Sequence, residues 1–381
     1  TPEYSSAASD VYKRQVDTLA PTVLDGDRAL YQYTPYVLGV TYPTGFPIYI
    51  LLSKVWVSVF AFGNIAWRMN LFSAVCAALT LPFIYRIGHH LWRDRQAALL
   101  STIALGTLPT YWLWATEAKT YTLSLLAFSM VLWLLVPKRD DLDASANKVG
   151  WLSKRYQWIH DHRFELAAFM MGVQVGIHNT AVLLLPGIIW LFFVVRKGSR
   201  DLGEGAPRQQ WGWIWYAGLF TLPIGSYFYV PLRAEWLLAQ YGREVAIARG
   251  LVADFYQSGL QGWITYFTAA DFTGGVVTNW GNVPGQFITV YLPFLEADFT
   301  WTGVVLGGVG FVALARFAPK YAAPFFLMYF TPIPFVLAYG QGEQRAFLLT
   351  ANLVFALFVG GSVVALKATI NRLGAQRLSL R

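Results

Sequence analysis

The chain has 381 residues, of which 56% are hydrophobic and only 13% are charged, and its mean hydropathy is +0.43. Soluble domains carry about 25% charged residues, so this composition excludes a water-soluble globule, and the apolar content also excludes a disordered chain. The single cysteine, Cys76, excludes a disulfide scaffold. The net charge of +8 resides in short basic clusters between apolar stretches, a pattern of membrane topology and not of a nucleic-acid partner.

The first 15 residues differ from the rest. Residues 5–15 (SSAASDVYKRQ) are, codon for codon, the translation of a widely used transposase sequencing adapter. A native polar tail would have to match this adapter by chance, so we interpret residues 1–15 as an unstructured artefact. Residues 16–381 are then expected to form a single membrane domain whose first span is largely missing.

Apolar windows recur from Ala66 to the C-terminus, and a transmembrane helix needs about 20 mostly apolar residues. The sequence therefore predicts an all-α, polytopic transmembrane bundle. The stretch 163–196 is too long for one span, and His178-Asn179 is its natural break. The nine predicted spans are 66–86, 97–113, 116–136, 163–178, 179–196, 211–231, 299–316, 321–339 and 345–366.

Basic residues indicate an orientation, because Lys and Arg accumulate in cytoplasmic loops. If the loop 86–96 is cytoplasmic, 19 basic residues lie on that face and 8 on the opposite one, leaving residues 1–15 aside. One more outward-running helix before Val16 is then required, which makes ten spans. The outer segments are about 19–65 and 232–298, and within them 48–62 and 286–295 are expected to be helices lying in the membrane interface.

The densest polar motif is LDGDR at 24–28. Its carboxylates, Asp25 and Asp27, are either part of a solvated turn or a reactive acid pair. The run that follows, LGVTYPTGFPIY at 38–49, contains Pro and Gly at positions that restrict the backbone. This indicates a shaped loop and favours the acid pair.

Several motifs in order resemble a known family. Together they are similar to the membrane family catalogued as domain of unknown function 2723, which is related to the GT-C glycosyltransferases and includes a protein O-mannosyltransferase. The resemblance runs from about Val16 to Gly361, densely up to Leu185. Besides LDGDR and the 38–49 run, the motifs are TLAPTV at 18–23, AWRMNLFSAV at 66–75, EAKTYTL at 117–123, HNTAVLLLP at 178–186 and YVPLRA at 229–234.

The resemblance implies an enzyme that moves a sugar, such as mannose, from a polyprenyl-phosphate carrier to an acceptor hydroxyl at the non-cytoplasmic face. The acceptor is a protein, a lipid or a glycan, and the host membrane is expected to be a bacterial plasma membrane. In many relatives the first outer loop reads roughly DAGEFQY. Counting back from Gly39 places Leu30 at the Glu position and Asp27 at the Asp position. Asp27 is thus the expected general base, with Asp25 in reserve.

The donor already carries its leaving group, so one carboxylate and one or two cations suffice, and no metal or other cofactor is required. Polar residues near the outer ends of spans are the candidates for binding the substrate. Arg68 and Arg233 could instead extend to lipid headgroups, His178 could simply cap a helix, and Glu343 and Arg345 could pair only with each other. The substrate-binding candidates are Arg233, His178, Arg68, Glu117, Lys119 and Arg345.

The alternative function is a transporter or flippase of lipid-linked glycans without catalysis. Transporters usually show internal repeats and charged or broken helices at mid-membrane. In this sequence the ionisable residues cluster near helix ends. A purely structural membrane protein would not explain two long outer segments rich in Gly, Pro and aromatic residues.

Overall fold

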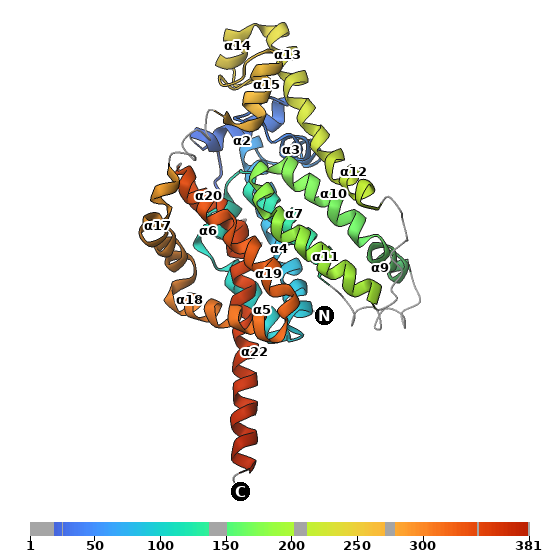
Figure 1. Cartoon of the computed structure of the whole chain (residues 1–381). Helices are drawn as coiled ribbons and strands as arrows, with labels where there is room; N and C mark the ends of the chain where they lie inside the picture. Colours follow the sequence, from blue (N-terminus) through green and yellow to red (C-terminus); the bar gives the residue numbers. More distant parts are fainter. Residues whose placement is uncertain are drawn as a thin grey trace.

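A computed structural model describes residues 19–24, 26–136, 151–201, 212–270, 279–340 and 343–379. Residues 1–15 and Asp25 lie outside these ranges. The described residues are almost entirely helical, with one isolated β-bridge between Val40 and Val252, and this confirms the expected all-α class. The helices of the bundle stand side by side, as Figure 1 shows.

The first outer segment contains α2 (Gly26–Val37) and α3 (Pro47–Val59), so the helix expected over 48–62 is present. The second contains α13 (Tyr229–Tyr241), α14 (Arg243–Ala248) and α15 (Gly259–Thr268). The other helices are α4 (Ile65–Trp92), α5 (Arg95–Gly106), α6 (Pro109–Thr116), α7 (Tyr121–Leu135), α9 (Trp151–Asp161), α10 (Arg163–Ile177), η1 (Asn179–Leu184), α11 (Leu185–Asp201), α12 (Gly212–Ile224), η2 (Gly225–Phe228), η3 (Trp280–Asn282), α17 (Val283–Gln286), η4 (Phe287–Tyr291), α18 (Leu292–Phe317), α19 (Pro319–Phe330), α20 (Pro332–Tyr339), α21 (Gln344–Phe347) and α22 (Leu349–Ser379).

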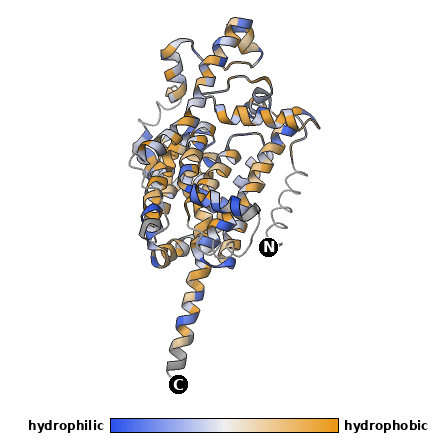
Figure 2. Ribbon diagram, turned by 90° about the vertical axis from the view of Figure 1, so that its right-hand side faces the viewer, coloured by the Kyte–Doolittle hydropathy of each residue, from blue (hydrophilic) through white to orange (hydrophobic). Residues whose placement is uncertain are grey.

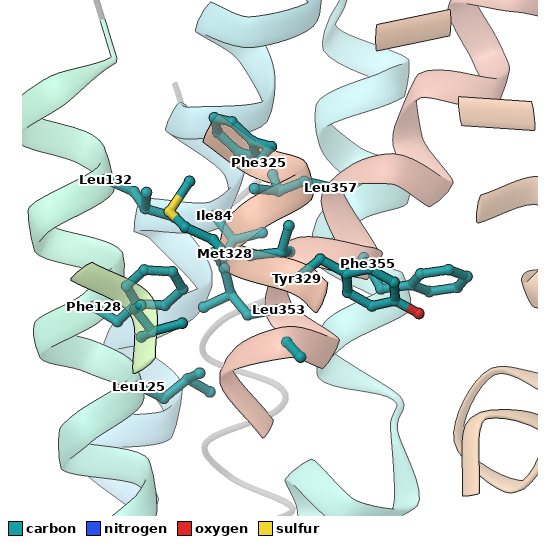
Figure 3. Close-up of a cluster of buried hydrophobic side chains, with 14 of the residues drawn as sticks. Ile84, Leu125, Phe128, Leu132, Phe325, Met328, Tyr329, Leu353, Phe355 and Leu357 are labelled. Carbon is teal, nitrogen blue, oxygen red and sulfur yellow. The ribbon is translucent and has the colours of Figure 1, made fainter. Parts of the chain in front are cut away.

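The core of the bundle lies between α4, α7, α19 and α22. Figure 3 shows their side chains meeting, among them Ile84, Phe128, Met328 and Leu353, all of which are buried. Glycines bring α22 close to its neighbours: a Cβ at Gly310 would lie 1.6 Å from the carbonyl oxygen of Phe358. As in other membrane bundles, small residues let helix backbones approach closely.

The number of long apolar helices is smaller than the nine predicted spans. Among the described residues, five helical stretches are long and apolar enough to cross a membrane, or six if the bent pair α6 and α7 is one span. The expected spans 97–113 and 211–231 do not form single long helices, because the chain breaks at Thr107-Leu108 and at η2. The expected span 163–178 forms one helix, α10, whose 15 residues are fewer than a membrane span needs. Hydropathy alone did not indicate the breaks at Thr107-Leu108 and η2, because both windows are mostly apolar.

Two of these breaks shape the molecule. The helices α6 and α7 are bent by 115° relative to each other across residues 117–120. The predicted break between 163–178 and 179–196 is confirmed: α10 ends at Ile177, His178 is extended, and η1 starts at Asn179. The segment expected as an interfacial helix, 286–295, is instead part of a helical run over Trp280–Phe317 with a kink at Thr300.

The two outer segments pack together at one end of the bundle (Figure 1), where α2 and α3 lie below α13, α14 and α15. The amide of Val40 donates to the carbonyl of Leu251, 2.8 Å away, and the amide of Ala253 donates to Val40 at 2.9 Å. Gly39 is required here, since a Cβ would lie 2.7 Å from the Leu251 carbonyl oxygen. The end of α22 projects from the opposite side, and Figure 2 shows hydrophobic residues along the helices between the two ends.

The basic-residue distribution predicts that Arg93 faces the cytoplasm and Arg243 the opposite side. Both side chains are exposed, and Cys76 is buried. In a Cys76→Ala background, single cysteines at positions 93 and 243 should react with a membrane-impermeant maleimide from opposite sides of sealed vesicles. Cysteines at positions 154 and 200 should be labelled from the same side as position 93, and cysteines at positions 27 and 271 from the same side as position 243. Labelling of positions 93 and 243 from the same side would contradict the orientation.

Candidate active site

A cavity of about 420 Å³ lies below the outer segments. It forms where the start of α2 meets the α6–α7 turn, the α10–η1 break and the segment from α20 to α21. Its walls are largely aromatic, and its charged groups come from three distant parts of the chain. The lining residues are Asp27, Tyr31, Tyr42, Pro43, Phe46, Lys119, Tyr121, His178, Asn179, Thr180, Phe255, Ala269, Phe335, Tyr339, Glu343 and Phe347.

Lys119 is the central charge of this cavity. Its side chain is only 3% exposed, and its Nζ lies 2.8 Å from Glu343 Oε1 and 3.5 Å from Asp27 Oδ2. The rings of Tyr31 and Trp114 flank the ammonium, with centroids 5.0 and 5.9 Å from Nζ. A buried ammonium is costly unless it is paired, and here two carboxylates and two aromatic faces compensate its charge.

Asp27 lies in the first turn of α2, where a negative charge interacts favourably with the free N–H groups of the helix. Its side chain is 49% exposed, so it can be reached from the cavity and from solvent. Burial, followed by the negative charge of Asp27 and a hydrogen bond to it, raises the pKa of Tyr42. The Tyr42 hydroxyl therefore stays protonated and can donate to this carboxylate.

A buried pair of amides fixes Asp27 relative to Lys119. Gln32 of α2 donates from Nε2 to Asn70 Oδ1 of α4 at 3.0 Å, and the same oxygen accepts from the backbone amide of Ala118 at 3.0 Å. Asn70 also donates from Nδ2 to the carbonyl of Ala20 at 2.9 Å. The first outer segment, α4 and the α6–α7 turn are thus held by one side chain, and buried amides are costly to leave unpaired.

His178 both caps η1 and lines the cavity. Its Nδ1 accepts from the backbone amide of Thr180 at 3.4 Å and lies 2.8 Å from the Thr180 hydroxyl. Since a backbone amide can only donate, Nδ1 is the acceptor and the ring is neutral, with its proton on Nε2. The ring stacks on Phe46 with centroids 5.2 Å apart. Capping thus does not exclude a role in the cavity.

Two of the candidate arginines bind backbone carbonyls of the first outer segment and do not line the cavity. Arg233 donates from Nε to Leu38 at 2.7 Å and from Nη2 to Val37 at 3.1 Å, at the end of α2. Arg68 donates from Nη1 to Val57 at 2.9 Å and to Phe60 at 3.0 Å, at the end of α3. Both satisfy carbonyls that a helix C-terminus leaves free.

The alternative that Glu343 and Arg345 pair only with each other is wrong. Glu343 contacts Lys119 and accepts a short hydrogen bond from the Tyr121 hydroxyl. Arg345 bonds Asp298, with 3.0 Å between Nη2 and Oδ1. Glu117 contacts Arg28, 3.2 Å away. Glu343 and Arg345 are two residues apart in sequence, yet their partners, Lys119 and Asp298, come from different parts of the chain.

Of the predicted candidates, Asp27, Lys119 and His178 line one cavity, whereas Arg233, Arg68, Glu117 and Arg345 do not, and Asp25 lies outside the described residues. Sequence reasoning missed Glu343, Tyr121 and Tyr42 as cavity residues. Tyr121 and Tyr42 stand inside the motifs 117–123 and 38–49, a signal that was present. Nothing local to Glu343 indicates Lys119 as its partner, which lies 224 residues earlier.

The fold is similar to that of solved membrane glycosyltransferases of the GT-C class. The crystal structure of ArnT from Cupriavidus metallidurans bound to undecaprenyl phosphate superposes with a TM-score of 0.56 at 14% identity, covering 94% of this chain and 59% of ArnT. An oligosaccharyltransferase from Archaeoglobus fulgidus, tethered to an acceptor peptide, gives 0.51 at 11% identity, with 95% and 49% covered. At these identities the likeness concerns the fold.

Residues 27–201 match the family model described as the protein O-mannosyl-transferase TMEM260 N-terminal domain. The mouse protein O-mannosyl-transferase TMEM260 is 27% identical over 249 residues, which are 63% of this chain and 32% of the mouse protein. Its Dictyostelium discoideum counterpart is 22% identical over 315 residues, 78% of this chain and 34% of that protein. The matched regions thus span about a third of these relatives.

The hydrogen bonds of Arg233 predict a structural effect. Arg233→Leu should lower the free energy of unfolding by about 1–3 kcal/mol, because it leaves the carbonyls of Val37 and Leu38 without their charged donor. Thermal unfolding in detergent measures the change. Arg249→Leu is the control, because Arg249 lies in the second outer segment, is exposed and contacts the Tyr241 ring. Its substitution should change the free energy of unfolding by no more than about 0.5 kcal/mol. Equal stability of the two variants would contradict the proposed anchoring.

Proposed function

We propose that this protein is a glycosyltransferase that moves a sugar from a polyprenyl phosphate to an acceptor hydroxyl within the cavity described above. The observation that carries the proposal is the half-exposed carboxylate of Asp27 beside the buried ammonium of Lys119, with 3.5 Å between Oδ2 and Nζ. A general base and a cation for a leaving phosphate are thereby adjacent in an aromatic cavity.

The chemistry needs little else from the protein. Asp27 accepts the proton of the acceptor hydroxyl while the hydroxyl oxygen attacks the anomeric carbon. The bond between that carbon and the phosphate oxygen breaks, and its electron pair leaves with the polyprenyl phosphate. Lys119 stabilises the charge that develops on this phosphate. The rings of Tyr42, Phe46 and Phe255 offer apolar faces to the sugar.

The relatives favour a particular donor and acceptor. Two are named protein O-mannosyl-transferases, which supports mannose as the sugar and a protein hydroxyl as the acceptor. ArnT binds undecaprenyl phosphate and the archaeal enzyme holds an acceptor peptide, which supports a lipid-phosphate carrier and a peptide in the same class of fold. We propose polyprenyl-phosphate mannose as the donor and Ser or Thr side chains as the acceptor.

We also propose that the cavity opens on the non-cytoplasmic face. The outer segments that cover it lie at the end of the bundle opposite to the projecting, Arg- and Lys-bearing end of α22. Basic residues concentrate in cytoplasmic segments, which supports this assignment. In a bacterial plasma membrane, the host membrane that we propose, this face is the exterior one.

Replacing the proposed base tests the function. Asp27→Asn in the full-length protein should lower the transfer rate about 10²–10⁴-fold, the usual cost of removing a general base, without loss of membrane insertion. The assay follows labelled mannose from polyprenyl-phosphate mannose to a Ser- and Thr-containing peptide.

Asp25→Asn is the matched control, since it removes a carboxylate two residues away and should have a smaller effect. Normal transfer by Asp27→Asn together with loss in Asp25→Asn would place the base at Asp25. Normal transfer by both variants would contradict the assignment of the base to this turn. Movement of the intact lipid-linked sugar across the membrane, with no transfer by the wild type, would favour a flippase.

A further inference from the structure

We propose that Glu343 holds the place of the donor phosphate on Lys119, and that the donor binds by displacing this carboxylate. The inference rests on the function proposed above and adds a residue that determines donor affinity. Glu343 has the shorter contact with the ammonium, at 2.8 Å against 3.5 Å for Asp27.

The surroundings of Lys119 leave an incoming anion little choice. The side chain is 3% exposed, the rings of Tyr31 and Trp114 flank Nζ, and the two carboxylates occupy further directions. An ammonium has three N–H donors. Two of these donors face the carboxylates, and burial and the two rings restrict access to the third, so a phosphate oxygen that binds Nζ with a short hydrogen bond competes for the position of a carboxylate.

The charges in the cavity give the same result. Among the lining residues that the structure describes, Lys119 is the one cation, His178 is neutral by its hydrogen bonds, and Asp27 and Glu343 are acidic. The site therefore carries a net charge of about −1 before a phosphodiester adds another. Like charges at contact distance in a partly buried site repel one another. Binding of the donor phosphate is therefore favourable only if one carboxylate breaks its contact with the Lys119 ammonium.

Glu343 is the carboxylate that can do so. In an in-line displacement the base and the leaving phosphate lie on opposite sides of the anomeric carbon. Because Asp27 is on the acceptor side, the phosphate takes the position of Glu343. After the exchange Glu343 still accepts the hydrogen bond of the Tyr121 hydroxyl, so its charge retains a donor.

This arrangement predicts a gain of affinity. Glu343→Gln has the same shape and still accepts from Tyr121, but it no longer competes as a charge. It should bind undecaprenyl phosphate about two- to fivefold more tightly than the wild type, the range that partly exposed ion pairs support. Glu343→Ala should change the affinity in the same direction, whereas Glu343→Asp keeps the charge and should remain near the wild type.

The experiment measures binding of undecaprenyl phosphate to the full-length protein in detergent by isothermal titration calorimetry, with Lys119→Met included. Glu235→Gln is the control, since Glu235 accepts from Tyr256 in the outer layer and does not line the cavity; its affinity should be unchanged. A residue that merely supports the fold would not tighten binding when it is replaced.

The outcomes separate the two proposals. If Lys119→Met loses binding but Glu343→Gln and Glu343→Ala bind equally or more weakly than the wild type, the displacement is overturned. The donor site on Lys119 would still be supported, and Glu343 would only position Lys119. Unchanged binding in Lys119→Met would overturn both the displacement and the proposed donor site. Tighter binding in both neutral variants and loss in Lys119→Met would support both.

Discussion

The structure depends on the compensation of one buried ammonium. Lys119 lies in the turn between α6 and α7, is almost inaccessible to solvent, and must have partners because an isolated buried charge is costly. Those partners are Asp27, at the start of α2, and Glu343, just before α21. The pairing therefore brings the first outer segment and the last turn of the bundle to the same cavity, and the polar part of the site follows from it.

Polar side chains that do not line the cavity, one amide and two guanidinium groups, hold the frame around this charge. Asn70 joins the first outer segment to α4 and to the turn that carries Lys119, and Arg233 and Arg68 bind the carbonyls at the ends of α2 and α3. Each of these side chains forms hydrogen bonds with backbone groups, which are costly to leave without partners when they are buried. Among the described residues that line the cavity, Lys119 is then the one cation, so the binding properties of the cavity depend on the balance between Lys119 and its two carboxylates.

The two carboxylates beside Lys119 can be compared with those that the sequence resemblance implies. The register counted back from Gly39 places Leu30 at the position of the glutamate that the resemblance implies in the first outer loop. The structure nevertheless gives the cavity a second carboxylate, Glu343, from the far end of the chain. Two acidic groups thus face the cavity although the first outer loop contributes only Asp27 among the described residues.

The sequence by itself determined the features that depend on local composition. Apolar windows predicted an all-α membrane bundle, Pro and Gly indicated the shaped loop at 38–49, and the polar pair His178-Asn179 marked a helix break, because hydropathy and backbone preference act over a few residues. The motifs also pointed to Asp27, Lys119 and His178. Only the tertiary structure decided that Glu343 pairs with Lys119, that Arg233 and Arg68 bind backbone carbonyls, and that α6 and α7 bend at 117–120. Those outcomes depend on which helices pack together, and a charge or a carbonyl takes its partner from whatever that packing brings near.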